Sequence, residues 1–184
     1  MTRELETKRA EIVLRMKALK ARLESGDDSE LLEWILTRRL ASAQRPLRHH
    51  PQYAGSGVII PAQATPLVFA WAAAVRGEGI KSIISFMHDR DRRCYSELDL
   101  QASDINEFFE NQGFVVARIP WVDPHHSKAD ARTKHKNLQR CRRETLAAFD
   151  ALPKPVLLQC SSGVDRSAPV AAYVWQHRRR AADD

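Results

Sequence analysis

The segment Pro155-Val-Leu-Leu-Gln-Cys-Ser-Ser-Gly-Val-Asp-Arg-Ser-Ala-Pro169 contains the pattern that decides the fold. Its apolar start predicts a short buried strand that ends near Gln159. A polar loop follows, and Pro169 suits the first turn of a helix, where its missing N–H costs little. The segment therefore predicts a strand, a tight loop and a helix that begins near Arg166.

The chain before this segment alternates short apolar runs with helical stretches. The predicted strands are 57–60, 81–86, 114–119 and 155–159. The predicted helices are 66–76, 103–112, 134–152 and the one that begins near residue 166. Alternation of this kind is typical of an α/β domain with a mostly parallel sheet flanked by helices. Ligands of such sheets bind beyond the carboxyl ends of the strands, which is where Cys160 lies.

The N-terminal residues have a different rhythm. One amphipathic helix is predicted from residue 2 to about 24, because apolar residues recur along one face: Leu5, Ile12, Met16, Leu19 and Leu23. Gly26 predicts a break, and a second helix is expected from about 29 to 43. Residues 1–45 are thus predicted to be a helical hairpin extension, joined by a proline-bounded linker to a main domain of residues 52–184. The hairpin either packs on that domain or offers a surface for oligomer formation.

The composition narrows the class of protein. The chain has 184 residues, a normal size for one domain, and 43% of them are hydrophobic. It contains no apolar run long enough for a membrane span and begins without an apolar signal segment, so a cytoplasmic protein is expected. The net charge of +6 favours an anionic partner, but the basic residues are scattered and also fit solvated helix faces. Aromatic residues are not interleaved with them, which argues against a nucleic-acid partner.

The loop after the last predicted strand has the chemistry of an oxyanion site. Peptide N–H groups in a tight loop at a helix N-terminus suit a tetrahedral dianion, and these residues would supply them: Ser161, Ser162, Gly163, Val164, Asp165 and Arg166. Gly163 lets the backbone curl, and the Arg166 guanidinium can hold two phosphate oxygens. The same donors favour the thiolate of Cys160, the nucleophilic form. Ser167 can donate a hydrogen bond to the sulfur.

These residues carry a resemblance to the protein tyrosine phosphatase superfamily, whose loop has cysteine, five residues, arginine, then serine or threonine, with glycine third after the cysteine. The order of elements from 57 to about 178 is similar to that of small dual-specificity phosphatases. The resemblance implies a cysteine-dependent phosphatase with a phosphocysteine intermediate and no metal or cofactor. Gln159 departs from the histidine usual at that position. Asp165 before the arginine resembles myotubularin-type lipid phosphatases, although Val164 departs from the lysine of similar bacterial loops.

The leaving oxygen needs a proton from a carboxylic acid on a loop. Asp123 follows the strand that ends at Ile119, as the acid does in the resembled family, and we expect it to be the general acid. Asp130 and Asp165 remain alternatives, and Asp123-Pro124 also fits a simple turn. His125 and His126 are predicted to be loop residues rather than metal ligands.

Two other cysteines, Cys94 and Cys141, bring the total to three. An odd number without paired spacing argues against a disulfide framework or a zinc site. Cys94 and Cys141 can protect Cys160 through a reversible disulfide, or they are ordinary half-buried thiols. The expected substrate is a phosphorylated protein, with phosphotyrosine favoured and phosphoserine or phosphothreonine also accepted. The alternatives are a phosphoinositide phosphatase, an RNA 5′-triphosphatase, or a catalytically weak module that binds phosphate.

Overall fold

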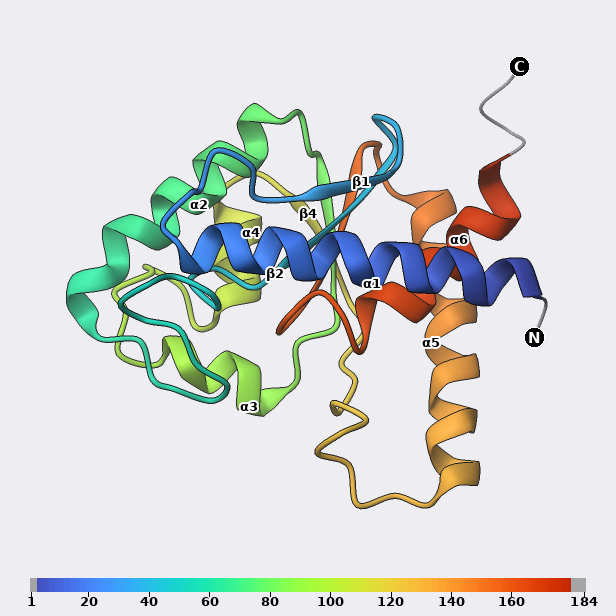
Figure 1. The fold of residues 1–184 in the computed structure, drawn as a ribbon. Coiled ribbons are helices and arrows are strands. Elements are labelled where there is room, and N and C mark those ends of the chain that lie inside the picture. The colour runs from blue at the N-terminus through green and yellow to red at the C-terminus, as the bar shows by residue number, and fades with distance from the viewer. Residues whose placement is uncertain (1–2, 180–184) are drawn as a thin grey trace.

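The computed structural model describes residues 3–179 and places one sheet at the centre of the molecule (Figure 1). Its five strands lie in the order β1-β2-β5-β3-β4. Their bounds are β1 Glu33–Leu36, β2 Leu40–Gln44, β3 Ser82–Ser85, β4 Val115–Arg118 and β5 Val156–Cys160. The strands from β2 to β4 are parallel, and β1 is antiparallel to β2. The predicted α/β class with a mostly parallel sheet is therefore confirmed.

Helices cover both faces of the sheet. The described residues form six α-helices: α1 Arg3–Glu24, α2 Thr65–Gly77, α3 Asp89–Arg92, α4 Ile105–Asn111, α5 Ala131–Ala151 and α6 Ser167–Arg178. Short 3-10 turns occupy Ala62–Ala64 and Arg93–Tyr95. One apolar core joins the sheet to α1, α5 and α6, and a second joins its other face to α2 and α4. None of the described helices has the length and apolar character needed to cross a bilayer.

Most predicted elements after residue 60 appear in the structure. The helices expected at 66–76, 103–112 and 134–152 correspond to α2, α4 and α5, and the strands at 81–86, 114–119 and 155–159 correspond to β3, β4 and β5. The strand expected at 57–60 is wrong. Gly57 has a φ of 74°, outside the extended region, and Val58 and Ile59 are exposed, so only Ile60 enters the core.

The predicted second helix at 29–43 is also wrong, because this stretch forms the hairpin of β1 and β2. Arg38, with a φ of 52°, turns the chain back on itself. Leu40 faces the core under α1 and α6, whereas Ala41 and Ala43 face the core under α2 and α4, which is the alternation of a strand buried on both faces. β2 pairs with β5 over its whole length, from Leu40 to Gln44. Residues 1–45 are therefore not a helical hairpin extension but supply two strands of the one sheet.

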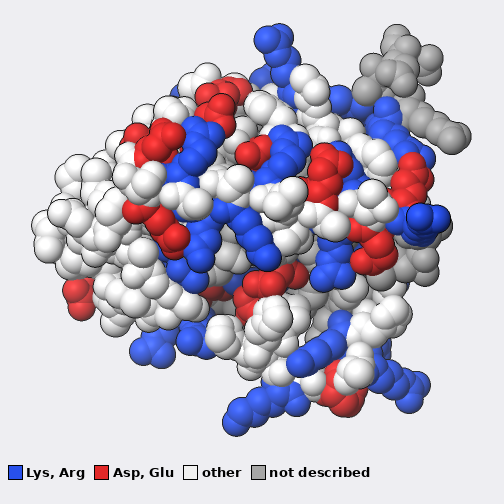
Figure 2. Space-filling view, in the orientation of Figure 1, with Lys and Arg blue, Asp and Glu red and all other residues white. Residues whose placement is uncertain are grey.

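The first helix is confirmed, but its apolar face is covered. The five residues that predicted α1 are all buried, and the helix packs along α6 (Figure 1). That face is consequently unavailable for the oligomer surface that the sequence suggested. On the solvent side of α1, Lys and Arg alternate with Asp and Glu and do not gather in one patch (Figure 2). Ion pairs such as Arg15 with Glu33, at 2.5 Å, account for part of this mixture.

Candidate active site

Cys160 is the last residue of β5, at the carboxyl edge of the sheet, and only 1% of it is exposed. The loop 161–166 leads from it into α6, which begins at Ser167. Within the loop Gly163 adopts a φ of 76°, and its N–H donates a hydrogen bond to Cys160 Sγ at 3.2 Å. A Cβ atom at this glycine would displace the terminal methyl of Met16 of α1. The loop therefore favours glycine here because of its backbone angle.

Other donors of this loop are unused. The backbone N–H groups of Ser162, Val164 and Asp165 have no acceptor among the described residues. Unpaired peptide N–H groups at the start of a helix attract an anion, because each carries a partial positive charge and needs a hydrogen-bond acceptor. The sulfur of Cys160 uses one loop amide and leaves these others free for an oxyanion above it.

Arg166 lies between the loop and the neighbouring strand ends, and only 1% of it is exposed. Its Nη1 donates to the carbonyl oxygens of Phe86 and Trp121, each at 3.1 Å. Nη1 and Nη2 also donate to the two carboxylate oxygens of Asp91, at 2.6 Å and 3.1 Å. Burial lowers the pKa of Arg166, but Cys160 and Asp91 together outweigh burial and raise it above its ordinary value. The guanidinium is therefore fixed in place and charged.

The remaining edge of this guanidinium includes a nitrogen that makes no hydrogen bond among the described residues. This nitrogen, Arg166 Nε, is buried. Because Asp91 occupies the edge formed by the two terminal nitrogens, the edge formed by Nε and Nη2 is left for a ligand. A guanidinium edge of this kind binds two oxygens of a phosphate or carboxylate.

Asp91 is the functional residue that the sequence analysis missed. It lies in the third position of the short helix α3, where its carboxylate also accepts a hydrogen bond from His88 N at 3.0 Å. Burial raises the pKa of Asp91, but the hydrogen bonds and charge of Arg166 exceed this effect and lower it. The only local signal is the charged run Asp89 to Arg93, which looks like an ordinary solvated turn.

Asp123, the expected general acid, comes to the same place. Its Oδ2 lies 3.9 Å from Arg166 Nε, and its Oδ1 accepts a hydrogen bond from His125 N at 2.9 Å. Asp123 also lines a cavity of about 40 Å³. Ser161, Asp91, His88 and His126 line this cavity with it. The loop after β4 thus brings a carboxylate to the mouth of the Cys160 loop.

The two alternative acids have other partners. Asp165 Oδ1 lies 3.1 Å from His125 Nε2, so it joins the Cys160 loop to the Asp123 loop. Asp130 is the N-cap of α5, where it accepts a hydrogen bond from Thr133 N at 2.7 Å. That bond is the main reason why the pKa of Asp130 is lowered. Of the three carboxylates, Asp123 is the one that faces Arg166.

The remaining residues in and beside the Cys160 loop differ in whether they make hydrogen bonds. Ser161 is held by the segment that follows β2, because its carbonyl accepts a hydrogen bond from Arg45 N at 3.0 Å and its hydroxyl accepts one from Arg48 Nε at 3.3 Å. Ser167 and Gln159 are fully buried, and their side-chain polar atoms have no hydrogen-bond partner among the described residues. The structure gives no contact between Ser167 Oγ and the sulfur.

Cys94 and Cys141 are free, buried thiols. Burial raises the pKa of Cys141 to about 11. No group of three or more His, Cys, Asp or Glu side chains within residues 3–179 is arranged to hold a metal ion. The histidines of the Asp123 loop contact Asp165 or line the small cavity instead.

The geometry as a whole is that of a buried sulfur beneath unpaired amides, with a fixed guanidinium and a carboxylate beside it. In comparisons with known proteins, no family model and no curated protein matches this chain.

Proposed function

We propose that the protein is a cysteine-dependent phosphatase of the protein tyrosine phosphatase type, which hydrolyses phosphomonoesters through a phosphocysteine. The observation that carries the proposal is the Nε of Arg166, a buried guanidinium nitrogen beside the loop of Cys160 that makes no hydrogen bond among the described residues, with the Asp123 carboxylate 3.9 Å away. A buried donor of this kind costs free energy unless a ligand satisfies it. A phosphoryl group bound by this edge and by the unpaired loop amides would satisfy both sets of donors.

In the first step the Cys160 thiolate attacks phosphorus. The sulfur supplies the electron pair of the new S–P bond, and the bond from phosphorus to the ester oxygen breaks. Asp123 enters this step as the carboxylic acid and gives its proton to the leaving oxygen, so that an alcohol or phenol departs. Arg166 and the loop amides bind the three phosphoryl oxygens. They stabilise the negative charge on these oxygens while one bond forms and the other breaks.

In the second step a water molecule attacks the phosphocysteine. The Asp123 carboxylate takes a proton from this water, the S–P bond breaks, and inorganic phosphate leaves with the thiolate restored. A hydrogen bond from the Ser167 hydroxyl would stabilise the departing sulfur, and that hydroxyl has no other partner in the described residues. Asp123 gives up one proton in the first step and takes one back in the second, so the cycle returns it to its protonated form.

The favoured substrates are phosphotyrosine residues of proteins, with phosphoserine and phosphothreonine next. A second candidate function is phosphate binding without turnover, and Gln159 favours it. Its buried amide has no partner among the described residues and replaces the histidine that tunes the thiol in the resembled family. Phosphoinositides and RNA 5′-triphosphates are the alternative substrates.

Phosphate release separates these candidates. The substrates to compare are phosphotyrosine and phosphoserine peptides, phosphoinositides and a 5′-triphosphate RNA. Cys160→Ser is expected to abolish release, and Asp123→Asn to slow it by about 10²–10⁴-fold. Asp130→Asn is the matched control, because this carboxylate caps α5, and its rate should stay within about twofold of wild type below its melting temperature. Full activity of the Cys160→Ser protein would refute the proposal, whereas vanadate binding without turnover of any substrate would favour the binding module.

A further inference from the structure

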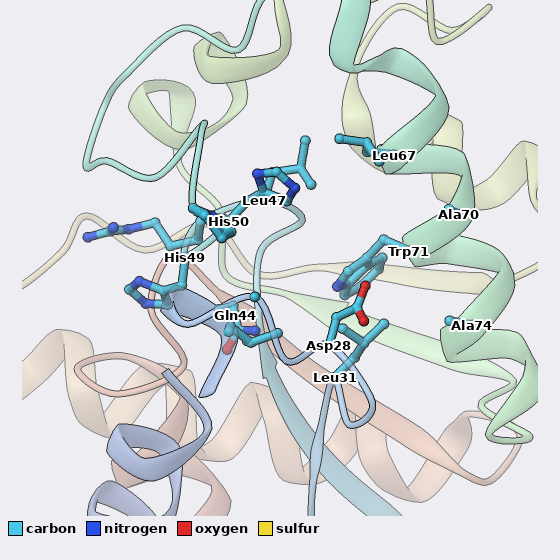
Figure 3. Close-up of a pocket in the computed structure, with 14 residues that line it drawn as sticks. Asp28, Leu31, Gln44, Leu47, His49, His50, Leu67, Ala70, Trp71 and Ala74 are labelled. Carbon is cyan, nitrogen blue, oxygen red and sulfur yellow. The ribbon is translucent and has the colours of Figure 1, made fainter. Parts of the chain in front are cut away.

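A second and larger cavity, of about 340 Å³, lies between α2 and the segment 44–51, on the other side of that segment from the Cys160 loop (Figure 3). It has two facing walls. Leu67, Ala70, Trp71 and Ala74 of α2 form one wall, and Gln44, Leu47, His49 and His50 belong to the other. Asp28 and Leu31, in the segment that connects α1 to β1, close it. Its volume is that of a small-molecule pocket and is too small for a folded partner.

The α2 wall is an apolar helix face without a covering element. Leu67, Ala70 and Ala74 recur at helical spacing and are exposed, whereas the neighbouring positions Val68 and Ala72 are buried in the core. A solvent-facing helix surface normally carries polar residues. Two small alanines on this face leave room for a flat molecule to lie close to the helix backbone.

Buried polar groups without partners border the same cavity. Trp71 is only 6% exposed, and its indole N–H has no acceptor among the described residues. Figure 3 shows this indole extending from α2 toward the segment 44–50, with its nitrogen on the side of the cavity. His49 is 3% exposed, and its Nε2 also lacks a hydrogen-bond partner within the described chain, whereas its Nδ1 lies 3.3 Å from Glu24 Oε1. An unsatisfied donor in a wall calls for a ligand that brings an acceptor.

The charges of the lining indicate an uncharged ligand. Asp28 supplies the one carboxylate of the lining, and no ion pair engages it among the described residues. Arg48 supplies the one permanent cation, but its guanidinium is directed to Ser161 of the Cys160 loop. Burial is the main reason why the pKa of His49 is lowered to about 4, so this ring is neutral at neutral pH. An anion would therefore lie beside an unpaired carboxylate with no free cation to offset it, whereas a cation could pair with Asp28 but would bring no acceptor for the Trp71 indole N–H.

We propose that this cavity is a binding site for a small, planar, uncharged compound with a carboxamide or cyclic amide group. Its carbonyl oxygen would accept the Trp71 indole N–H, and its amide N–H would donate to the Asp28 carboxylate. The ring would lie between the alanines of α2 and Leu47. The site is separate from the Cys160 loop, and the proposal does not depend on phosphatase activity.

Three isosteric probes test this directly, because benzamide is neutral, benzoate is an anion and benzamidinium is a cation. Binding is followed by nuclear magnetic resonance of the indole N–H signals of the four tryptophans, and Trp71→Phe assigns the signal of interest. Benzamide is expected to move the Trp71 signal and leave the Trp175 signal in place, with a dissociation constant in the millimolar range of a fragment. Benzoate is expected to bind at least about fivefold more weakly, because its carboxylate lies beside Asp28. Benzamidinium can pair with Asp28 but has no acceptor for the indole N–H, so it should not reproduce the shift of the Trp71 signal that benzamide causes.

Two matched variants locate the site. Ala70→Phe places a ring in the cavity and should weaken benzamide binding at least about tenfold. Ala73→Phe is the control, because Ala73 is exposed on the same helix and does not line the cavity. Ala74→Phe serves as a second blocking variant if Ala70→Phe unfolds. The proposal is overturned if the Trp71 signal does not respond to benzamide, if benzoate binds as well, if benzamidinium shifts the Trp71 signal as benzamide does, or if Ala73→Phe weakens binding as much as the blocking variants.

Discussion

Asp91 holds Arg166 by two hydrogen bonds, from Nη1 at 2.6 Å and from Nη2 at 3.1 Å. The pair lies where α3 meets the strand ends, and Asp91 is 13% exposed at its side chain. Because a guanidinium is planar and rigid, fixing one edge also fixes the direction of the other. Asp91 therefore sets the position of the Nε edge that the proposed phosphoryl group would use, although it does not contact that group itself.

Asp91→Asn tests this positioning role. The amide keeps the shape of the carboxylate but loses its charge and one acceptor, so the guanidinium edge becomes less well held. We expect kcat/KM for p-nitrophenyl phosphate to fall by about 10–100-fold, since small misplacements of a catalytic group are costly. Asp91→Glu should recover less than the full rate, because its longer side chain moves the guanidinium.

Asp89→Asn is the control for that experiment. Asp89 is an exposed neighbour on the same short helix and pairs with Arg92 instead. Its substitution should leave kcat/KM within about twofold, as is usual for exposed ion pairs. Equal losses in the two variants would show that α3 as a whole, and not the Arg166 contact, is responsible.

The contact between Asp91 and Arg166 also explains why sequence reasoning found one partner and not the other. Arg166 lies within a loop whose residues are all adjacent in the chain, so the spacing alone predicted it. Asp91 is 75 positions away, on a helix of four residues that has no apolar pattern. Only the assembled sheet, which places β3 beside β5, brings it near. Asp123 was found because it follows a recognisable strand.

The error at residues 29–43 has a similar cause. Leu31, Leu32, Ile35, Leu36 and Leu40 recur at spacings that suit a helix, and the local pattern is ambiguous. A long-range interaction favours strands here: β5 pairs with β3 on one side, and β2 pairs with its other side. Ala41, Ser42 and Ala43 are small enough to fit between the helical layers, all at 0% exposure.

Cys160 and Cys141 should differ in reactivity. Iodoacetamide is expected to modify Cys160 first at pH 6.5–7, because a loop amide donates to its sulfur and Arg166 lies nearby. Cys141 should stay unmodified in the folded protein, since burial raises its pKa to about 11 and leaves it as a thiol at neutral pH. Mass spectrometry of the digested protein measures both. Vanadate should protect Cys160, and labelling of Cys141 ahead of Cys160 would contradict the assignment.

The pair of His125 and Asp165 is expected to hold the Asp123 loop over the Cys160 loop. His125→Ala and Asp165→Asn should each lower kcat by about 3–10-fold, in the range of about 1 kcal/mol for a partly exposed contact. Because both act through one contact, the double variant should be no slower than the slower single variant. Losses that multiply would mean that the two residues act separately. The steady-state kinetics of the four proteins give the answer.

His49 should make the stability of the fold depend on pH. Burial, and then the charge of Arg48, lowers its folded pKa to about 4, while the unfolded chain has the ordinary value of 6.5. Between pH 4 and pH 6.5 the unfolded chain therefore binds a proton at His49 that the folded protein does not bind. This proton stabilises the unfolded state, and the effect disappears above about pH 6.5. As the pH falls from 6.5 toward 4, the free energy of unfolding should decrease by up to about 3 kcal/mol from this group. Glu24, whose Oε1 lies 3.3 Å from His49 Nδ1, reduces the effect.

Urea unfolding at pH 7.5 and pH 5 measures this loss of stability. His49→Gln should reduce the difference in unfolding free energy between the two pH values, whereas an unchanged pH dependence in this variant would assign the effect to other groups.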